Sequence, residues 1–184
     1  MKTEKTISSS QFQLYSLPIF FICSVLMFVI YHFQFTKTDI VKETLVLLST
    51  YGYWNILFIF LTVIFSIILH ELIHGITLSF YYKRKFQSIN FGVIWKSLMP
   101  YCNCQEELKV KHYRIGVIMP FLILGIIPLV LSILFKSIIL FFYSYLLIIA
   151  ATGDLIIFFL LLRESSTTLI LDHPSKIGYI KIEN

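Results

Sequence analysis

Four apolar stretches, each long enough to cross a lipid bilayer as a helix, constrain this sequence more than any other feature. They are residues 17–35, 54–81, 115–135 and 138–162. A helix needs about 20 apolar residues to cross roughly 30 Å of hydrocarbon, and only helices and closed barrels satisfy their backbone hydrogen bonds there. The sequence therefore predicts an all-α polytopic membrane protein with four transmembrane helices, forming a single membrane domain over residues 1–184.

The composition agrees with a bilayer as the surrounding medium. Hydrophobic residues make up 58% of the chain and charged residues only 14%, whereas soluble domains carry about 25% charged residues. The net charge of +5 raises the question of a nucleic-acid partner, but the basic residues gather in short segments between the apolar stretches. We therefore expect a lipid bilayer and no nucleic acid as partner. Three cysteines are too few to indicate a disulfide framework.

The distribution of positive charge predicts the orientation in the membrane. Of the 15 Lys and Arg residues, 2 precede the first stretch, 7 lie in the loop 82–114 and 3 lie in the tail 163–184. These 12 fall on one side of the membrane if each stretch crosses once, and an excess of Lys and Arg marks the cytoplasmic side. We expect an integral membrane protein, in the plasma membrane, with both termini cytoplasmic. No small-residue cleavage site follows the first stretch, so we interpret it as a retained helix rather than a secretory signal.

The cytoplasmic loop 82–114 is expected to contain some structure of its own. Between residues 87 and 96 the apolar side chains occupy every second position, which is typical of a strand with one buried face. From Gln105 to Arg114 acidic residues come first and basic residues last, which favours a short interfacial helix. Within the third apolar stretch, Pro120 and Pro128 each remove a backbone donor and predict a kink.

Residues 70–74 read H-E-L-I-H, in the middle of the second apolar stretch. Each charged side chain at such a depth costs about 2.5–3.5 kcal/mol, so these residues require a compensating partner. On a helix, residues four apart share a face, so His70 and His74 can bind one Zn²⁺ while Glu71 acts as the general base. Zinc brings the pKa of a water ligand towards 7. The alternative is a pair of buried histidines that bond only to helix neighbours.

A catalytic zinc generally takes three protein ligands, and the fourth apolar stretch contains one acid, Asp154. Nine residues separate Asp154 from Arg163, and nine separate His74 from Lys83. At 1.5 Å per residue each lies about 13 Å from its basic boundary, so the two are expected at matching depth. Otherwise Asp154 is protonated, or it bonds to a hydroxyl such as that of Thr77 or Ser79. The competing third ligands are Asp172, His173 and Glu164, which require the tail to fold back.

These residues bear a resemblance to a known family. H-E-L-I-H-G in an apolar stretch, with an Asp in a later stretch, resembles the site-2-protease-like intramembrane zinc metalloproteases. Several segments between about residues 55 and 180 are more closely similar to a group known as putative zincin peptidases: His70–Gly75, Met99–Cys102, the stretch around Pro120, Gly153–Asp154 and Leu171–Gly178. The resemblance implies a zinc held by His70, His74 and Asp154, with Glu71 as the catalytic base.

One departure from the wider family concerns the acidic ligand. Site-2 proteases usually present it after Asn-Pro and before Gly, whereas this chain reads Thr152-Gly153-Asp154-Leu155. The substrate-clamping role of the family Asn therefore has no counterpart at this place.

The sequence favours an intramembrane zinc metalloprotease that hydrolyses peptide bonds of membrane-associated substrates near the cytoplasmic side. One alternative is a zinc-dependent hydrolase of a non-peptide amide or ester. Another is a non-enzymatic membrane protein with a structural or vestigial metal site. The alternating segment 87–96 either pairs with an extended substrate or only covers the site. Cys102 and Cys104 are either reduced loop thiols or a second metal or redox pair.

Overall fold

The computed structural model describes residues 2–35, 54–95, 99–104, 106–173 and 176–182, together with residues 42, 45, 46, 49 and 52. The helices are α1 (Ser9–Phe35), α3 (Trp54–Ser79), the 3₁₀ turn η1 (Lys85–Ser88), α4 (Val110–Pro120), the π-helical η2 (Phe121–Ile126), α5 (Ile127–Phe135), α6 (Ile138–Ala150) and α7 (Thr152–Leu161). The strands are β1 (Lys2–Thr6), β2 (Ile89–Ile94), β3 (Met99–Cys104), β4 (Leu108–Lys109), β5 (Leu169–Asp172) and β6 (Gly178–Ile182).

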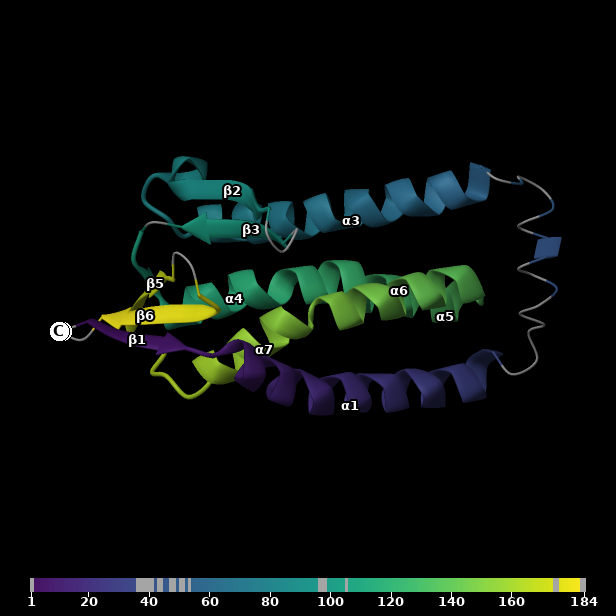
Figure 1. The fold of residues 1–184 in the computed structure, drawn as a ribbon, viewed down its shortest axis with the longest axis horizontal. Helices are drawn as coiled ribbons and strands as arrows, with labels where there is room; N and C mark the ends of the chain where they lie inside the picture. Colours follow the sequence, from purple (N-terminus) through teal and green to yellow (C-terminus); the bar gives the residue numbers. More distant parts are fainter. Residues whose placement is uncertain are drawn as a thin grey trace.

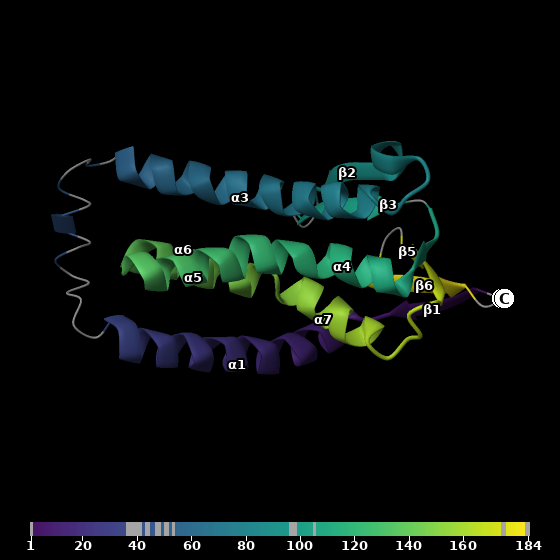
Figure 2. The same ribbon diagram turned by 180° about the vertical axis from the view of Figure 1, so that it is seen from behind.

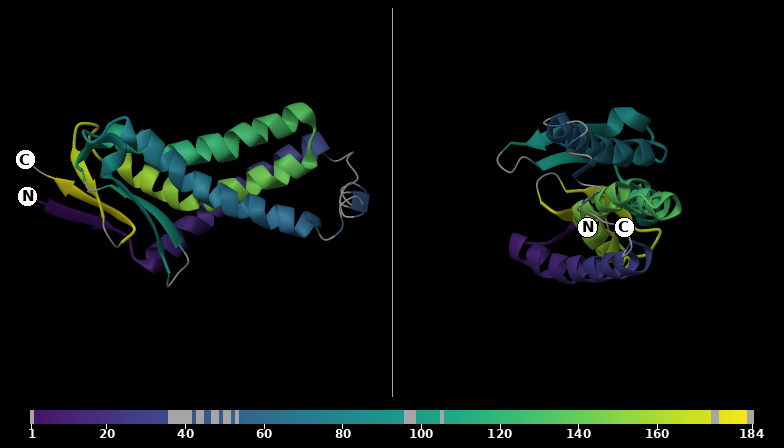
Figure 3. Two further views of the ribbon diagram at one scale, coloured as in Figure 1. Left: turned by 90° about the horizontal axis from the view of Figure 1, so that it is seen from above. Right: turned by 90° about the vertical axis from the view of Figure 1, so that its right-hand side faces the viewer.

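The helices form an elongated bundle, and all the strands gather at one end of it (Figure 1). Helix α3 packs against α4, whereas α1 packs against α6 and α7. Helices α4 to α7 therefore form a middle layer between α1 and α3, as the view from behind also shows (Figure 2). Both termini lie at the strand end (Figure 3).

Three helical segments are long and apolar enough to cross a membrane: Ser9–Phe35, Trp54–Ser79 and the continuous run Val110–Phe135. In the last of these, Pro120 and Pro128 are accommodated by η2 rather than by a break. The Ile127 N–H bonds to the Leu122 carbonyl, five residues back. In a regular α-helix the ring of Pro128 would clash with the carbonyl of Leu124, four residues before it. The wider π-helical turn includes Leu124 and relieves this clash.

The fourth apolar stretch is divided into two helices, a break that the sequence did not predict, and the two together are long and apolar enough for a span if the bent pair counts as one. Helices α6 and α7 meet at Ala151 with a bend of 49°. The Thr152 hydroxyl donates a hydrogen bond to the Ile149 carbonyl at 2.6 Å, so a side chain satisfies a backbone group at the break. The bend restarts the helix immediately before Asp154, which therefore lies in the first turn of α7.

The strands form two separate sheets. β2 and β3 make an antiparallel hairpin that packs on α3. The other sheet has the order β1-β6-β5-β4 and joins the N-terminal segment to the tail. This second sheet was not predicted, because the tail 163–184 was assigned no structure and β1 precedes the first apolar stretch. Its core contains the fully buried Ile170 beside Leu161 and Val110.

Two local predictions for the loop need correction. The alternating segment forms a strand only over Ile89–Ile94, after the turn η1, and Trp95 lies in a turn with 80% of its surface exposed. Of the interfacial helix expected from Gln105 to Arg114, residues Val110 to Arg114 are helical as the beginning of α4, whereas Leu108–Lys109 is a strand. Residues 96–98 and Gln105 lie outside the described residues.

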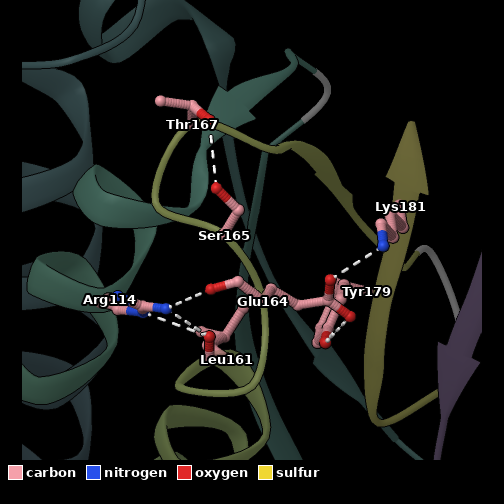
Figure 4. A network of polar contacts seen from close by, with 7 residues as sticks. All are labelled: Arg114, Leu161, Glu164, Ser165, Thr167, Tyr179 and Lys181. Atoms are coloured by element: carbon pink, nitrogen blue, oxygen red, sulfur yellow. Dashed lines mark hydrogen bonds and ion pairs between the residues drawn. The ribbon is translucent and has the colours of Figure 1, made fainter. Parts of the chain in front are cut away.

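Arg114 fixes the end of α7 to the beginning of α4 (Figure 4). Its Nη2 donates to the carbonyls of Leu161 at 2.6 Å and Glu164 at 2.7 Å. The Glu164 carboxylate accepts from the Tyr179 hydroxyl and pairs with Lys181 at 3.0 Å. A cation on the last carbonyls of a helix also complements the helix dipole. The network therefore holds α7, which carries Asp154, against α4 and the sheet.

Candidate metal centre

His70 and His74 lie one turn apart on α3 and present their rings to the middle layer. The ring centroids are 4.9 Å apart, with the ring planes at 75°. Gly75 allows the hairpin to cover this part of α3, because a Cβ there would overlap the ring of Phe91. In the H-E-L-I-H-G segment the two imidazoles thus occupy one face of α3, and Gly75 lets the β2–β3 hairpin pack closely on another face.

Asp154 lies against both rings. Its Oδ2 is 2.9 Å from His70 Nε2, and its Oδ1 is 3.3 Å from His74 Nε2. One ligand atom from each of the three residues lies within 4.8 Å of the other two. Among the described residues, this is the one group of His, Cys, Asp or Glu side chains that lie close enough together to share a metal ion. The expected proximity of the fourth stretch to the histidines is thus present, and their role as ligands stays a prediction.

A hydrogen bond from a neighbouring helix orients His74. Its Nδ1 lies 2.9 Å from the carbonyl oxygen of Gly116 on α4. Since a carbonyl only accepts, Nδ1 carries a proton, and Nε2, which faces Asp154, is the nitrogen available to bind a metal when the ring is neutral. Metal-binding histidines are typically held by such a bond. Gly116 also permits the close approach, because a Cβ there would lie 2.5 Å from Leu78 Cγ.

The residues fit a zinc ion on two grounds. Asp154 Oδ2 is buried and forms no well-directed hydrogen bond within the described residues, although His70 Nε2 is 2.9 Å away. In addition, ligand atoms about 2.1 Å from a tetrahedral zinc lie about 3.4 Å apart, which is near the two distances of 2.9 and 3.3 Å. Two imidazole nitrogens and one carboxylate leave a fourth position open, as in catalytic zinc sites.

Glu71 faces a cavity at the strand end of the bundle. Its carboxylate interacts with the backbone N–H of Cys102 in β3. This cavity, called the outer cavity below, has a volume of about 700 Å³ and is also lined by His74 and Asp154. A carboxylate beside the candidate metal centre, open to a cavity, is placed to exchange protons with a substrate.

The competing third ligands lie elsewhere. The Glu164 carboxylate pairs with Lys181, away from the histidines. Nδ1 of His173 accepts a bond from the Lys176 backbone, and its Nε2 lies 3.6 Å from Glu4. Ser79, considered as a partner for Asp154, donates to the Ile76 carbonyl within its own helix.

Asp172 does enter the outer cavity, although it is not among the three clustered residues. Its Oδ1 accepts from the Tyr113 hydroxyl at 2.8 Å, and its Oδ2 lies 3.4 Å from the Cys104 N–H. Burial raises the pKa of this carboxyl to about 6. Asp172 therefore braces β5 against α4 and β3 at the wall of the cavity.

The cysteine pair is not part of a metal cluster among the described residues. Cys102 lines the outer cavity, and Cys104, the last residue of β3, is buried. Both cysteines are free thiols, and burial raises the pKa of each above its usual range. A metal or redox role for the pair stays a prediction.

Sequence reasoning missed two elements of this site. The supporting carbonyl of Gly116 has no signal in the sequence, because a backbone oxygen carries no residue identity. The strand that borders the cavity is mainly β3, through Pro100, Tyr101, Cys102 and Asn103, and β2 contributes only Val93. The alternating pattern identified β2, whereas β3 lacks such a pattern.

Comparison with curated proteins and with solved structures finds no match. Comparison with protein families finds one described as "Putative zincin peptidase", which matches residues 63–169, from within α3 through the hairpin and the middle layer, and includes the three clustered residues. The match covers more than half of the chain, and the chain therefore belongs to this family.

Proposed function

We propose that this protein is an integral membrane zinc metallopeptidase that cleaves membrane-associated substrates near the cytoplasmic side of the bilayer. The observation that carries the proposal is the convergence of His70, His74 and Asp154 from two separate apolar helices, with Glu71 beside them at a cavity. Buried ionisable groups in such helices are costly unless they serve one another or a ligand. A shared divalent cation removes that cost for all three.

The surface of the bundle supports placement in a membrane. Large apolar side chains on α1 and α3 face outward, for example Phe21 with 68% and Phe58 with 73% of the side chain exposed. Water would not favour so continuous an apolar surface, whereas lipid does. The basic residues gather at the strand end, which the positive-inside rule assigns to the cytoplasm.

The chemistry follows from the roles of four side chains. His70, His74 and Asp154 would hold the zinc, which supplies a Lewis acid for the scissile carbonyl and lowers the pKa of water. Glu71 accepts the proton of the attacking water and returns it to the leaving amine. The bond between His74 Nδ1 and the Gly116 carbonyl would hold the His74 ring in the orientation that turns Nε2 towards Asp154.

A substrate helix must unwind before its peptide bonds become accessible, since helical carbonyls are already hydrogen-bonded. Residues Pro100 to Asn103 of β3 line the cavity, and the Cys102 N–H interacts with the Glu71 carboxylate. Addition of an extended substrate along β3 would place its backbone beside the catalytic base. This assigns to β3 the pairing role that the sequence suggested for the segment 87–96.

The test uses Glu71→Gln, which keeps the size and shape of the side chain and removes the base. Purified wild type and variant should contain equal zinc, and proteomic comparison of cells carrying each should show membrane-protein fragments only with wild type. Glu107→Gln, at an exposed loop position away from the cluster, is the matched control and should behave as wild type. Equal cleavage by Glu71→Gln and wild type would contradict the proposal.

A further inference from the structure

The candidate metal centre borders two cavities that differ in the polar groups they offer. The outer cavity, at the strand end, combines apolar residues such as Leu78 and Val117 with four polar side chains that the inner cavity lacks: Asn103, Asp172, His173 and Lys176. A second, inner cavity of about 400 Å³ lies on the other side of Asp154. Its apolar wall comes from α1, α3, α6 and α7 and contains Phe12, Ile67, Leu147, Ala150, Gly153 and Ile157.

The one hydroxyl side chain that lines the inner cavity is already hydrogen-bonded. Ser66 Oγ donates to the Thr62 carbonyl at 2.6 Å and lies 2.6 Å from the Tyr143 hydroxyl. Apart from the residues of the metal centre, the described lining therefore offers a ligand apolar surface. Such a cavity favours an aliphatic or aromatic group over a polar one.

Glu71 and Asp154 line both cavities, so the two spaces meet at the catalytic base. A chain that passes Glu71 in an extended conformation places successive side chains on opposite sides of its backbone. A side chain on one side can therefore enter the apolar inner cavity, while its neighbour on the other side faces the outer cavity and its polar groups.

We infer that the inner cavity is the subsite for an apolar side chain of the substrate residue next to the scissile bond, with polar residues held in the outer cavity. This inference rests on the proposed function. It defines the substrate class as membrane segments that are cut where an apolar run gives way to a polar one.

Gly153 offers a way to fill the inner cavity without disturbing the helices. A Cβ at this position would meet only the Phe12 ring, at ordinary contact distances of 3.7 and 4.0 Å. The Gly153→Leu variant therefore extends its side chain into the cavity, and Ala150→Leu fills it from α6. The matched control is Val93→Phe, which adds bulk to the outer cavity instead.

The experiment measures the binding of three metal chelators to cobalt-substituted protein through the cobalt absorption bands: acetohydroxamate, 4-methylpentanohydroxamate and dodecanohydroxamate. In wild type the branched chain should bind about tenfold to a hundredfold more tightly than acetohydroxamate, because its added carbons are buried. Gly153→Leu and Ala150→Leu should each reduce that ratio to near one, and Val93→Phe should keep it.

Three results would overturn the inference, and they differ in what else they affect. Equal binding of the two short hydroxamates, or a ratio unchanged by both filling variants, removes the subsite and leaves the metal centre intact. A further large gain for dodecanohydroxamate that both filling variants abolish assigns the cavity to a lipid chain. Protein that binds no cobalt at all overturns the proposed function, and the subsite with it.

Discussion

Replacing Gly116 by alanine tests whether the contact between α3 and α4 supports the metal centre. The added Cβ would lie 2.5 Å from Leu78 Cγ, with a second Leu78 atom closer still. Ordinary contact begins near 3.4 Å, and Leu78 is buried with 4% of its surface exposed, so we expect α4 to move away from α3 by about 1 Å rather than the Leu78 side chain to turn aside. The bond from His74 Nδ1 to the Gly116 carbonyl, now 2.9 Å, would then approach 4 Å, beyond hydrogen-bonding range.

Loss of this support should weaken zinc binding by about tenfold to a hundredfold, which is the usual effect of removing a group that orients a metal ligand. Overpacking should also lower the free energy of unfolding by about 1–3 kcal/mol. Competition with a chelating dye gives the zinc affinity of detergent-purified protein. Thermal unfolding gives the stability separately.

Two further variants separate the local effect from a general loss of packing. Gly125→Ala also overpacks the third helical segment, since its Cβ would lie 2.8 Å from an Ile148 side-chain atom. It should lower stability and leave zinc affinity unchanged. Leu78→Ala removes the obstructing atoms, so the double variant with Gly116→Ala should regain zinc affinity. Wild-type zinc affinity in Gly116→Ala, or no recovery in the double variant, would refute the reasoning.

The remaining predictions concern the braces around the site. Because the pKa of Asp172 is raised to about 6, the folded protein binds more protons than the unfolded chain between about pH 4 and 6. The free energy of unfolding should therefore fall as pH rises across that range, by at most about 3 kcal/mol. Thermal unfolding of Asp172→Asn at several pH values should not show this fall. The same fall in the variant as in wild type would contradict the raised pKa of Asp172. Arg114→Ala removes the donors to the Leu161 and Glu164 carbonyls and should cost about 1–3 kcal/mol in thermal unfolding. Arg114→Lys should recover only part of that loss, because an ammonium lacks the guanidinium fork; full recovery would show that charge alone matters.

The sequence was sufficient to predict the elements that depend on local patterns. Apolar length identified three helical segments that could span a membrane, and the i, i+4 spacing placed His70 and His74 on one face. Counting residues back from the basic boundaries brought Asp154 to the depth of His74, and the 3.3 Å distance between their side chains agrees with that reasoning.

The elements that were missed depend on contacts between distant parts of the chain. The four-stranded sheet joins Lys2–Thr6 to a tail more than 170 residues away, and neither segment carries a pattern that identifies its partner. The 49° bend before Asp154 was hidden because Ala151 and Thr152 are compatible with a continuous helix in lipid. The carbonyl of Gly116 is a backbone group, so only the packing of α3 on α4 reveals its role.

The zinc content of purified protein, measured after zinc loading and removal of loosely held metal, tests the central claim most directly. Wild type should retain one zinc per chain, and Asp154→Ala should retain almost none. Asp172→Ala, which removes a carboxylate from the same cavity outside the cluster, should retain one. Zinc-free wild type, or full occupancy in Asp154→Ala, would contradict the assignment of His70, His74 and Asp154 as the metal ligands.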